Sequence, residues 1–312
     1  MTSEVSRWRL IAAYAAVYVL WGSSYLGIQV AIETLPPLFS AGLRYAVAGL
    51  AIMIWLLARG TPMPGKAEWG IGIVSGVLMF VINSGGIVWG TQFVPSGMVA
   101  LMNATTALWM VLIDWLVYRS ARPNRMVFLG LLLGLVGMVM LSGPDQSNPA
   151  GIYPPALIIL IIAPGAWALG SLLVRRSRVP LEPVRTSAIQ LTTGGLLLSL
   201  VGMFNGELVG FQWDTVSLRS LLAILYLAIA SSIIAYGSFV WLMRVDTPVR
   251  VSTYGFVNPI IALFLGVVLA GETLTMNTLA AAAVILAGVI IITYHKYLRL
   301  PGRLRAAPQS VP

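Results

Sequence analysis

Long apolar runs without charge recur along the chain, separated by short polar segments rich in Pro and Gly. Each run is about 20 residues long, the length that an α-helix needs to cross a bilayer. The runs do not alternate between apolar and polar residues, as the strands of a membrane β-barrel do. The charge-free stretch 69–113 has room for two helices, with Pro95 and Gly97 at the turn between them. The pattern predicts ten transmembrane helices at 10–32, 38–58, 69–90, 98–118, 126–142, 155–174, 184–204, 221–243, 251–270 and 275–294.

Basic residues gather in alternate loops between these predicted helices. If the N-terminus is cytoplasmic, all of the 19 Lys and Arg residues except Arg44 and Arg219 fall in cytoplasmic segments. Arg44 lies inside the second predicted helix, and Arg219 lies in an outer loop. An excess of Lys and Arg in cytoplasmic loops is the normal pattern of membrane proteins. It predicts that both termini are cytoplasmic, and it accounts for the net charge of +9 without a nucleic-acid partner.

The composition excludes a soluble domain. Of the 312 residues, 58% are hydrophobic and 9% are charged, against about 25% charged in an ordinary soluble protein. In lipid the backbone must satisfy its own hydrogen bonds, which favours an all-α integral membrane protein. The chain has one His and no Cys, and it contains no P-loop, HExxH or Gly-x-Ser-x-Gly motif. We therefore expect no metal site, no cofactor and no enzymatic activity.

A weak internal repeat relates the two halves of the chain. When the second half is laid over the first, Trp167 falls on Trp21, Pro183 on Pro37 and Gln190 on Arg44. Helices one to five then match helices six to ten. Because five is odd, the second copy enters the membrane from the opposite side. The sequence thus predicts two inverted five-helix repeats, 1–145 and 146–312, an arrangement typical of transporters.

Several short motifs occur in a recognisable order along the whole chain. They are Trp21-Gly22-Ser23-Ser24-Tyr25, Pro36-Pro37, Ala41-Gly42-Leu43-Arg44-Tyr45, Ala48-Gly49, Val94-Pro95-Ser96-Gly97, Trp167-Ala168-Leu169-Gly170-Ser171, Asn258-Pro259 and Gly271-Glu272-Thr273-Leu274. Together they resemble the EamA-type exporters of the drug/metabolite transporter superfamily, and within them the YedA group. The resemblance implies a ten-helix, inverted-repeat exporter of amino acids, other metabolites or toxic compounds, in a bacterial inner membrane. One departure is that Ser120 stands in the first half where Glu272 stands in the second.

Arg44 is the charged residue placed most deeply in a predicted helix, and a cation at that depth needs a partner. It either binds a substrate carboxylate or a gating partner, or it is a structural lock bonded to helix-end carbonyls or to Glu33. Asp114, the one carboxylate predicted within a helix, is expected to pair with Arg119 or Arg122 near the cytoplasmic interface. No carboxylate is then well placed for proton antiport.

Polar and aromatic residues near the middle of the predicted helices are the other candidates for a site. Trp21 and Trp167 either form the wall of a cavity for cationic or aromatic ligands or pack in the ordinary way. Pro259 removes a backbone hydrogen bond beside Asn258, which produces either a hinge or a kink that neighbouring helices satisfy. The complete predicted substrate-binding set is Trp21, Ser24, Arg44, Asn83, Trp89, Asn103, Thr106, Trp167, Tyr236, Tyr254 and Asn258.

These observations favour a secondary transporter that exports a small molecule by alternating access around a central cavity. A channel or lipid scramblase is the alternative, and an intramembrane enzyme is disfavoured because no nucleophile or acid–base pair is evident. The expected partners are a small-molecule substrate and membrane lipids. The segment Arg175-Arg176-Ser177-Arg178 is placed to touch anionic head groups.

Overall fold

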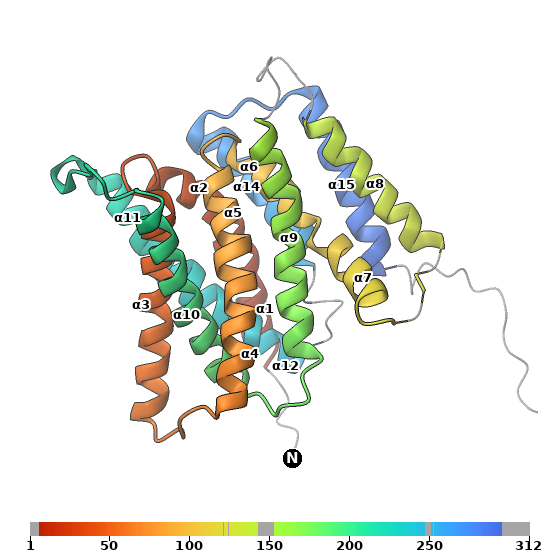
Figure 1. Ribbon diagram of the computed structural model, residues 1–312. Helices are drawn as coiled ribbons and strands as arrows, with labels where there is room; N and C mark the ends of the chain where they lie inside the picture. Colours follow the sequence, from red (N-terminus) through yellow and green to blue (C-terminus); the bar gives the residue numbers. More distant parts are fainter. Residues whose placement is uncertain are drawn as a thin grey trace, which may run out of the picture.

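The computed structural model describes residues 6–120, 122, 123, 125–142, 153–246, 251 and 253–294. Within these ranges every regular element is a helix (Figure 1). The described residues contain seven helical stretches long and apolar enough to cross a membrane: Arg7–Ala31, Pro37–Ala58, Lys66–Gly90, Ser96–Leu116, Pro154–Arg176, Pro183–Phe204 and Leu218–Leu242. Shorter apolar helices at Arg125–Gly137, Val257–Ala270 and Met276–Ile291 occupy the remaining predicted positions. The predicted all-helical membrane class is confirmed. Of the ten predicted spans, the described helices are long and apolar enough to cross a membrane at seven.

The elements of the first half are α1 (Arg7–Ala15), η1 (Ala16–Leu20), α2 (Trp21–Ala31), α3 (Pro37–Ala58), α4 (Lys66–Gly76), η2 (Val77–Ser84), α5 (Gly85–Gly90), α6 (Ser96–Ala104), α7 (Thr106–Leu116) and α8 (Arg125–Ser142). Those of the second half are α9 (Pro154–Arg175), α10 (Pro183–Phe204), η3 (Trp213–Thr215), α11 (Leu218–Tyr226), η4 (Leu227–Ala235), α12 (Tyr236–Val245), α14 (Tyr254–Ala270) and α15 (Met276–Tyr294). Prolines open α3, α9 and α10, because the first turn of a helix needs no N–H at that position. The predicted boundary at 145/146 lies outside the described residues.

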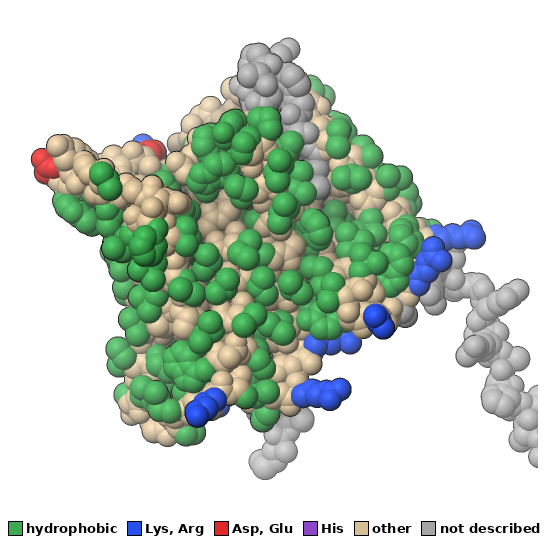
Figure 2. Space-filling model, in the orientation of Figure 1, with side chains coloured by type: hydrophobic (Ala, Val, Ile, Leu, Met, Phe, Trp, Pro, Cys, Tyr) green, Lys and Arg blue, Asp and Glu red, His purple; other side chains and the backbone are tan. Residues whose placement is uncertain are grey.

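The outer surface of the helices is largely apolar. Ile54, Phe204 and Phe264 are among the large hydrophobic side chains that it exposes. In Figure 2 such side chains cover the middle of the molecule, most Lys and Arg lie along its lower margin, and Asp and Glu lie at the upper left. An apolar belt between polar ends is the surface expected of a protein embedded in lipid.

Helices of the first half pack against helices of the second half in a repeated pattern. The helix α3 packs along α10, α6 along α14, and α8 along α15. In addition α2 contacts α11 and α14, and its counterpart α9 contacts η2, α5 and α6. In Figure 1 α3 descends while α10 ascends, and α8 ascends while α15 descends. The contacts therefore recur when the two halves are exchanged.

The contact between α3 and α10 is close enough to require glycine. A Cβ built on Gly42 would lie 2.3 Å from the backbone nitrogen of Ser199, and one on Gly49 would lie 2.4 Å from that of Thr192. From the opposite side, a Cβ on Gly195 would lie 2.3 Å from the nitrogen of Ala46. Small residues that bring two backbones together are a common means of joining helices in membranes. Here they join the two halves of the chain.

A glycine followed by a glutamate ends α10 and binds the start of α3. Gly206 has a positive φ of 80°, which turns the chain out of the helix. The backbone N–H of Glu207 then donates to the carbonyl of Gly202 over 3.1 Å. Its carboxylate accepts hydrogen bonds from the backbone N–H groups of Leu38 at 3.0 Å and Phe39 at 2.9 Å. The charge thereby caps the positive end of the α3 dipole.

The same construction is repeated where α14 ends beside α6. Gly271 has a φ of 67°, and the N–H of Glu272 donates to the carbonyl of Gly266 over 3.0 Å. The Glu272 carboxylate accepts from Ser96 through its backbone N–H at 3.0 Å and its hydroxyl at 2.7 Å, and from the N–H of Gly97 at 3.4 Å. We call Gly206-Glu207 and Gly271-Glu272 the Gly–Glu corners. Each fastens a helix start of the first half to the second half.

Candidate functional site

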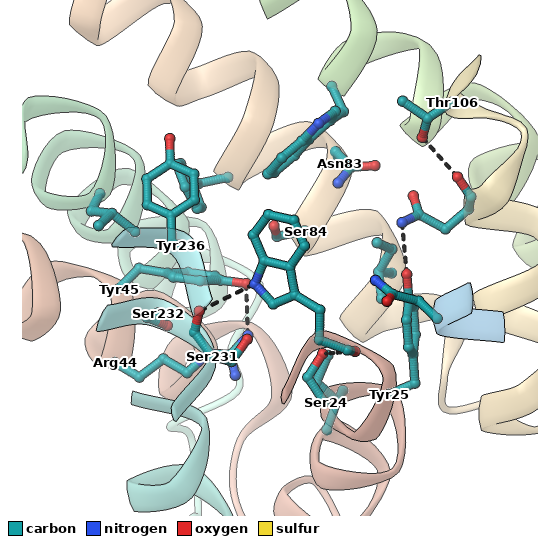
Figure 3. A pocket seen from close by; sticks show the side chains of 18 of the residues that line it. Ser24, Tyr25, Arg44, Tyr45, Asn83, Ser84, Thr106, Ser231, Ser232 and Tyr236 are labelled. Carbon is teal, nitrogen blue, oxygen red and sulfur yellow. Dashed lines mark hydrogen bonds between the residues drawn. The ribbon is translucent and has the colours of Figure 1, made fainter. Parts of the chain in front are cut away.

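A central cavity with a volume of about 100 Å³ lies between the two halves. Helices α2, α3, α5, α6, α7, α9, α10, α12 and α14 contribute to its wall, together with η2 and η4. Of the predicted site residues, it is lined by Trp21, Ser24, Arg44, Asn83, Asn103, Thr106, Trp167, Tyr236, Tyr254 and Asn258. Residues far apart in the sequence are thus brought to one place. Figure 3 shows this cavity from close by.

Trp89 is the predicted residue that lies elsewhere. Its ring packs 4.8 Å from that of Phe93 and 6.4 Å from that of Tyr153, measured between ring centroids. Trp89 follows Ile87 by two residues, which is about 200° around the α-helical α5. Since Ile87 lines the cavity, Trp89 points away from it. Trp89 therefore does not line this cavity, unlike the other members of the predicted substrate-binding set.

Seven of the residues that line the cavity are aromatic. The ring of Trp21 lies 6.3 Å from that of Trp167 and 5.2 Å from that of Tyr254, edge to face in both cases. Its indole nitrogen donates to the backbone carbonyl of Ser231 at 3.2 Å. Tyr236 adds a further ring 6.4 Å from Trp21. The matched tryptophans of the two halves meet at the centre of the molecule.

Arg44 is buried at 4% exposure and contacts no carboxylate that the structure describes. One guanidinium nitrogen, Nη2, donates to the hydroxyl of Tyr45 over 2.6 Å, and the guanidinium carbon lies 4.4 Å from the centre of the Tyr45 ring. The other two nitrogens, Nε and Nη1, have no acceptor. Glu33, the partner considered in the lock interpretation, instead faces Arg219 at 3.5 Å. Neither Glu33 nor a helix-end carbonyl holds Arg44.

The polar groups of the wall are only partly satisfied. Asn103 donates to the hydroxyl of Tyr25 at 2.7 Å and accepts, through its backbone carbonyl, from Thr106 at 2.7 Å. The side-chain oxygens of Asn83, Asn103 and Asn258 are buried and receive no hydrogen bond. Buried acceptors of this kind are costly unless something supplies a donor. All three belong to residues that line the cavity.

Two π-helical segments, η2 and η4, face the cavity, and no residue pattern in the sequence predicts them. In η2 the hydroxyl of Ser84 donates to the carbonyl of Met79 over 3.1 Å, and in η4 that of Ser232 donates to the carbonyl of Leu227 over 3.1 Å. Both serines line the cavity. Such wide turns are rare and frequently occur at functional sites. Their equivalent positions in the two halves are a second sign of the repeat.

The remaining wall residues were also missed. They are Tyr25, Ile28, Tyr45, Phe80, Ser84, Ile87, Leu191, Ser231 and Ser232. Most are apolar or aromatic side chains within apolar helices. Their spacing does not distinguish a cavity face from a lipid face. The matched serines and the Arg44-Tyr45 pair were the available signals.

Two carboxylates near the helix ends form ion pairs with arginine side chains away from the cavity. Asp114 pairs with Arg176 at 2.5 Å, so the expected pairing with Arg119 or Arg122 is wrong. Glu68, which sequence reasoning overlooked, is 3% exposed in the first turn of α4 and pairs with Arg185 of α10 at 2.7 Å. Among the described residues no group of three or more His, Cys, Asp and Glu side chains is arranged to hold a metal ion.

Further hollows adjoin the cavity on the side where α9 ends. One of about 120 Å³ shares Thr106 and Tyr254 with the cavity and reaches Arg175. Another of about 300 Å³ shares Tyr236 and also reaches Arg175. A hollow beside Pro37, which opens α3 at the other end of the molecule, measures only about 10 Å³. The cavity is thus hollowed toward the Arg175 side.

Comparison with known proteins identifies the family of this chain. The profile of the EamA-like transporter family matches the chain twice, over residues 8–143 and 154–294. The chain belongs to the EamA-like transporter family. An EamA protein is a membrane transporter, and the two matches make the internal repeat a property of the family domain.

Individual relatives agree with this assignment. The uncharacterized inner membrane transporter YedA of Escherichia coli (strain K12) is 33% identical over 96% of this chain and 95% of its own length. A probable amino-acid metabolite efflux pump of Salmonella typhimurium is 25% identical over 92% of this chain and 96% of its own. A solved crystal structure shares the fold with a TM-score of 0.64 and 21% identity, over 94% of this chain and 100% of that one. The EamA resemblance is confirmed, and the protein is a multi-pass transporter of the inner membrane.

Proposed function

We propose that this EamA transporter exports small metabolites, such as amino acids or related compounds, or drugs, by alternating access around the central cavity. The observation that carries the proposal is the cavity itself. It lies between the two halves and holds polar groups of both that lack partners. A binding site at the interface of two repeats is the usual arrangement of secondary transporters. The efflux-pump relative adds support for the export direction.

The proposal includes a topology of ten spans in two inverted halves, 1–145 and 146–312, with both termini cytoplasmic. The antiparallel course of α3 against α10, and of α8 against α15, supports the inversion (Figure 1). The basic residues along the lower margin in Figure 2 support a cytoplasmic assignment for that end. In this topology α8, α14 and α15 span the membrane together with the seven longer stretches.

The cycle begins from a conformation open to the cytoplasm. The hollows beside Arg175 lie at the end assigned to the cytoplasm, whereas the Gly–Glu corners hold the helices together at the opposite end. Substrate enters from the Arg175 side and binds in the cavity. The halves then rearrange so that the opposite end opens.

Counterflow in proteoliposomes tests the proposal. The purified protein is reconstituted, preloaded with a panel of amino acids, amines and drugs, and assayed for saturable exchange of labelled compound. Trp21→Ala, inside the cavity, is expected to abolish exchange, and Trp89→Ala, outside it, is expected to preserve exchange. Both variants are first checked for an unchanged elution profile. Flux that does not saturate, or ionic conductance, indicates a channel instead, and equal loss in both variants removes the cavity from the mechanism.

A further inference from the structure

Arg44 brings a fixed positive charge into the central cavity. An arginine side chain remains protonated in proteins, so the charge cannot be lost by titration. The side chain is 4% exposed, and Tyr45 supplies the one acceptor that it has. A buried cation without a counter-charge is unfavourable, because the attraction that offsets its desolvation is missing. An anion entering the cavity would remove this deficit.

The described carboxylates do not supply that anion, because no Asp or Glu lines the cavity. Glu68 and Asp114 pair with arginines at the helix ends. Glu207 and Glu272 cap α3 and α6 through the Gly–Glu corners. None of them lines the cavity. The charge partner of Arg44 therefore has to come with the ligand.

The opposite part of the cavity wall holds hydrogen-bond acceptors that lack donors. The unpaired side-chain oxygens of Asn83, Asn103 and Asn258 belong to η2, α6 and α14. In Figure 3 Arg44 and Ser232 lie on one side of the view, and Asn83 and Thr106 lie on the other. A ligand with an anionic group at one end and an ammonium or hydroxyl group at the other matches both sides.

We infer that the cavity recognises small organic carboxylates that also carry a hydrogen-bond donor, with Arg44 binding the carboxylate. Zwitterionic amino acids fit this description, and organic cations do not. The aromatic wall alone would favour cations through their attraction to ring faces. Arg44 reverses that preference, because a second cation in the same small cavity is repelled. Tyr45 positions the guanidinium by accepting a hydrogen bond from it and stacking against it.

Ligands that share a side chain but carry, mask or lack the carboxylate test the inference, which rests on the proposed transport function. The purified protein is titrated with phenylalanine, phenylalaninamide and 2-phenylethylamine, and with the corresponding leucine, leucinamide and isoamylamine series. Binding is followed by intrinsic tryptophan fluorescence and thermal stabilisation. Loss of a charge-assisted hydrogen bond should weaken binding of the amide and the amine about 10- to 100-fold relative to the amino acid. 3-Phenylpropionate, which lacks the ammonium group, should bind with intermediate strength.

Variants identify Arg44 as the cause of the preference. Arg44→Gln should reduce amino-acid binding to the level of the amide, and Arg44→Lys should restore part of it. Arg59→Gln is the matched control, because Arg59 stacks on Trp55 with 4.3 Å between its guanidinium carbon and the ring centroid but does not line the cavity. It should leave binding unchanged.

The outcomes separate this inference from the transport proposal. The inference is overturned if the wild-type protein shows no preference for carboxylates across the panel, or if Arg44→Gln retains the preference. Saturable exchange without such a preference would leave the transporter proposal standing and this inference refuted. Carboxylate binding that depends on Arg44 without any exchange would refute transport and keep the binding site.

Discussion

Replacing Gly49 with alanine should force α3 and α10 apart. The new Cβ would lie 2.4 Å from the nitrogen and 2.5 Å from the hydroxyl of Thr192, and 2.8 Å from the Cβ of Leu191, whereas ordinary contacts begin at 3.4 Å. The overlap is therefore about 1 Å, and the obstructing nitrogen belongs to a helix backbone that cannot rotate away. Overpacking of this kind costs about 1–3 kcal/mol, against a gain of up to about 1 kcal/mol from the better helix propensity of alanine.

The melting temperature of the purified protein measures the balance. At roughly 2–4 °C per kcal/mol, Gly49→Ala is expected to melt up to roughly 8 °C below the wild type, and roughly 2–12 °C below a helical Gly→Ala variant that has the same propensity gain without the clash. Gly70→Ala in α4 is the control, since no heavy atom lies within 4 Å of its Cβ position. It should melt at the wild-type temperature or slightly above. If Gly49→Ala melts no lower than Gly70→Ala, the backbones are farther apart than described and the argument for this helix contact is wrong.

Three further outcomes are expected. Arg185→Gln alone should destabilise the protein by about 3–5 kcal/mol because it leaves the buried Glu68 carboxylate unpaired. Glu68→Gln should cost less because Arg185 is partly exposed, and the double variant should recover much of the Arg185→Gln loss in a double-mutant cycle of melting curves. Glu272→Gln should lower the free energy of unfolding by about 0.5–2 kcal/mol through a weaker cap on α6, and an unchanged denaturation midpoint would contradict this. The chain has no cysteine, so a single introduced cysteine reports on which side of the membrane its segment lies. Gln212→Cys should react with an impermeant maleimide in intact cells, and Lys66→Cys should not. Reaction of both variants would overturn the assigned topology.

The helices themselves were largely predictable from the sequence. The predicted second and seventh spans, 38–58 and 184–204, differ by one residue from Pro37–Ala58 and Pro183–Phe204. A helix in lipid must be apolar over a fixed length, and proline marks where its first turn starts. Both requirements are local, so the residues alone reveal them. The start of α15 differs by one residue from the predicted 275–294 and that of α14 by three from the predicted 251–270, but their length does not by itself establish that they span the membrane.

The cavity was predictable only where chemistry made a residue conspicuous. Arg44 and the Asn side chains stood out because polar groups in lipid need partners, and the repeat drew attention to Trp21 together with Trp167. The error at Trp89 and the omission of Phe80 have another cause. Which face of an apolar helix points inward depends on its rotation, and the π-helical turn at Ser84 shifts that rotation. Hydrophobic side chains suit lipid and protein neighbours alike, so periodicity carries no such information here.

In the proposed cycle, the Gly–Glu corners would set an energetic threshold for release of the substrate to the far side of the membrane. Any conformation that separates α3 from α10, or α6 from α14, at that end must withdraw a carboxylate from a helix start and leave backbone N–H groups unpaired. At about 0.5–2 kcal/mol per cap, breaking both caps makes the opened form roughly 5- to 1000-fold rarer than the closed form. In the proposed alternating-access cycle, an empty transporter would therefore spend most of its time facing the compartment that loads it. Differential contacts made by a bound molecule have to exceed this bias before the pathway reverses.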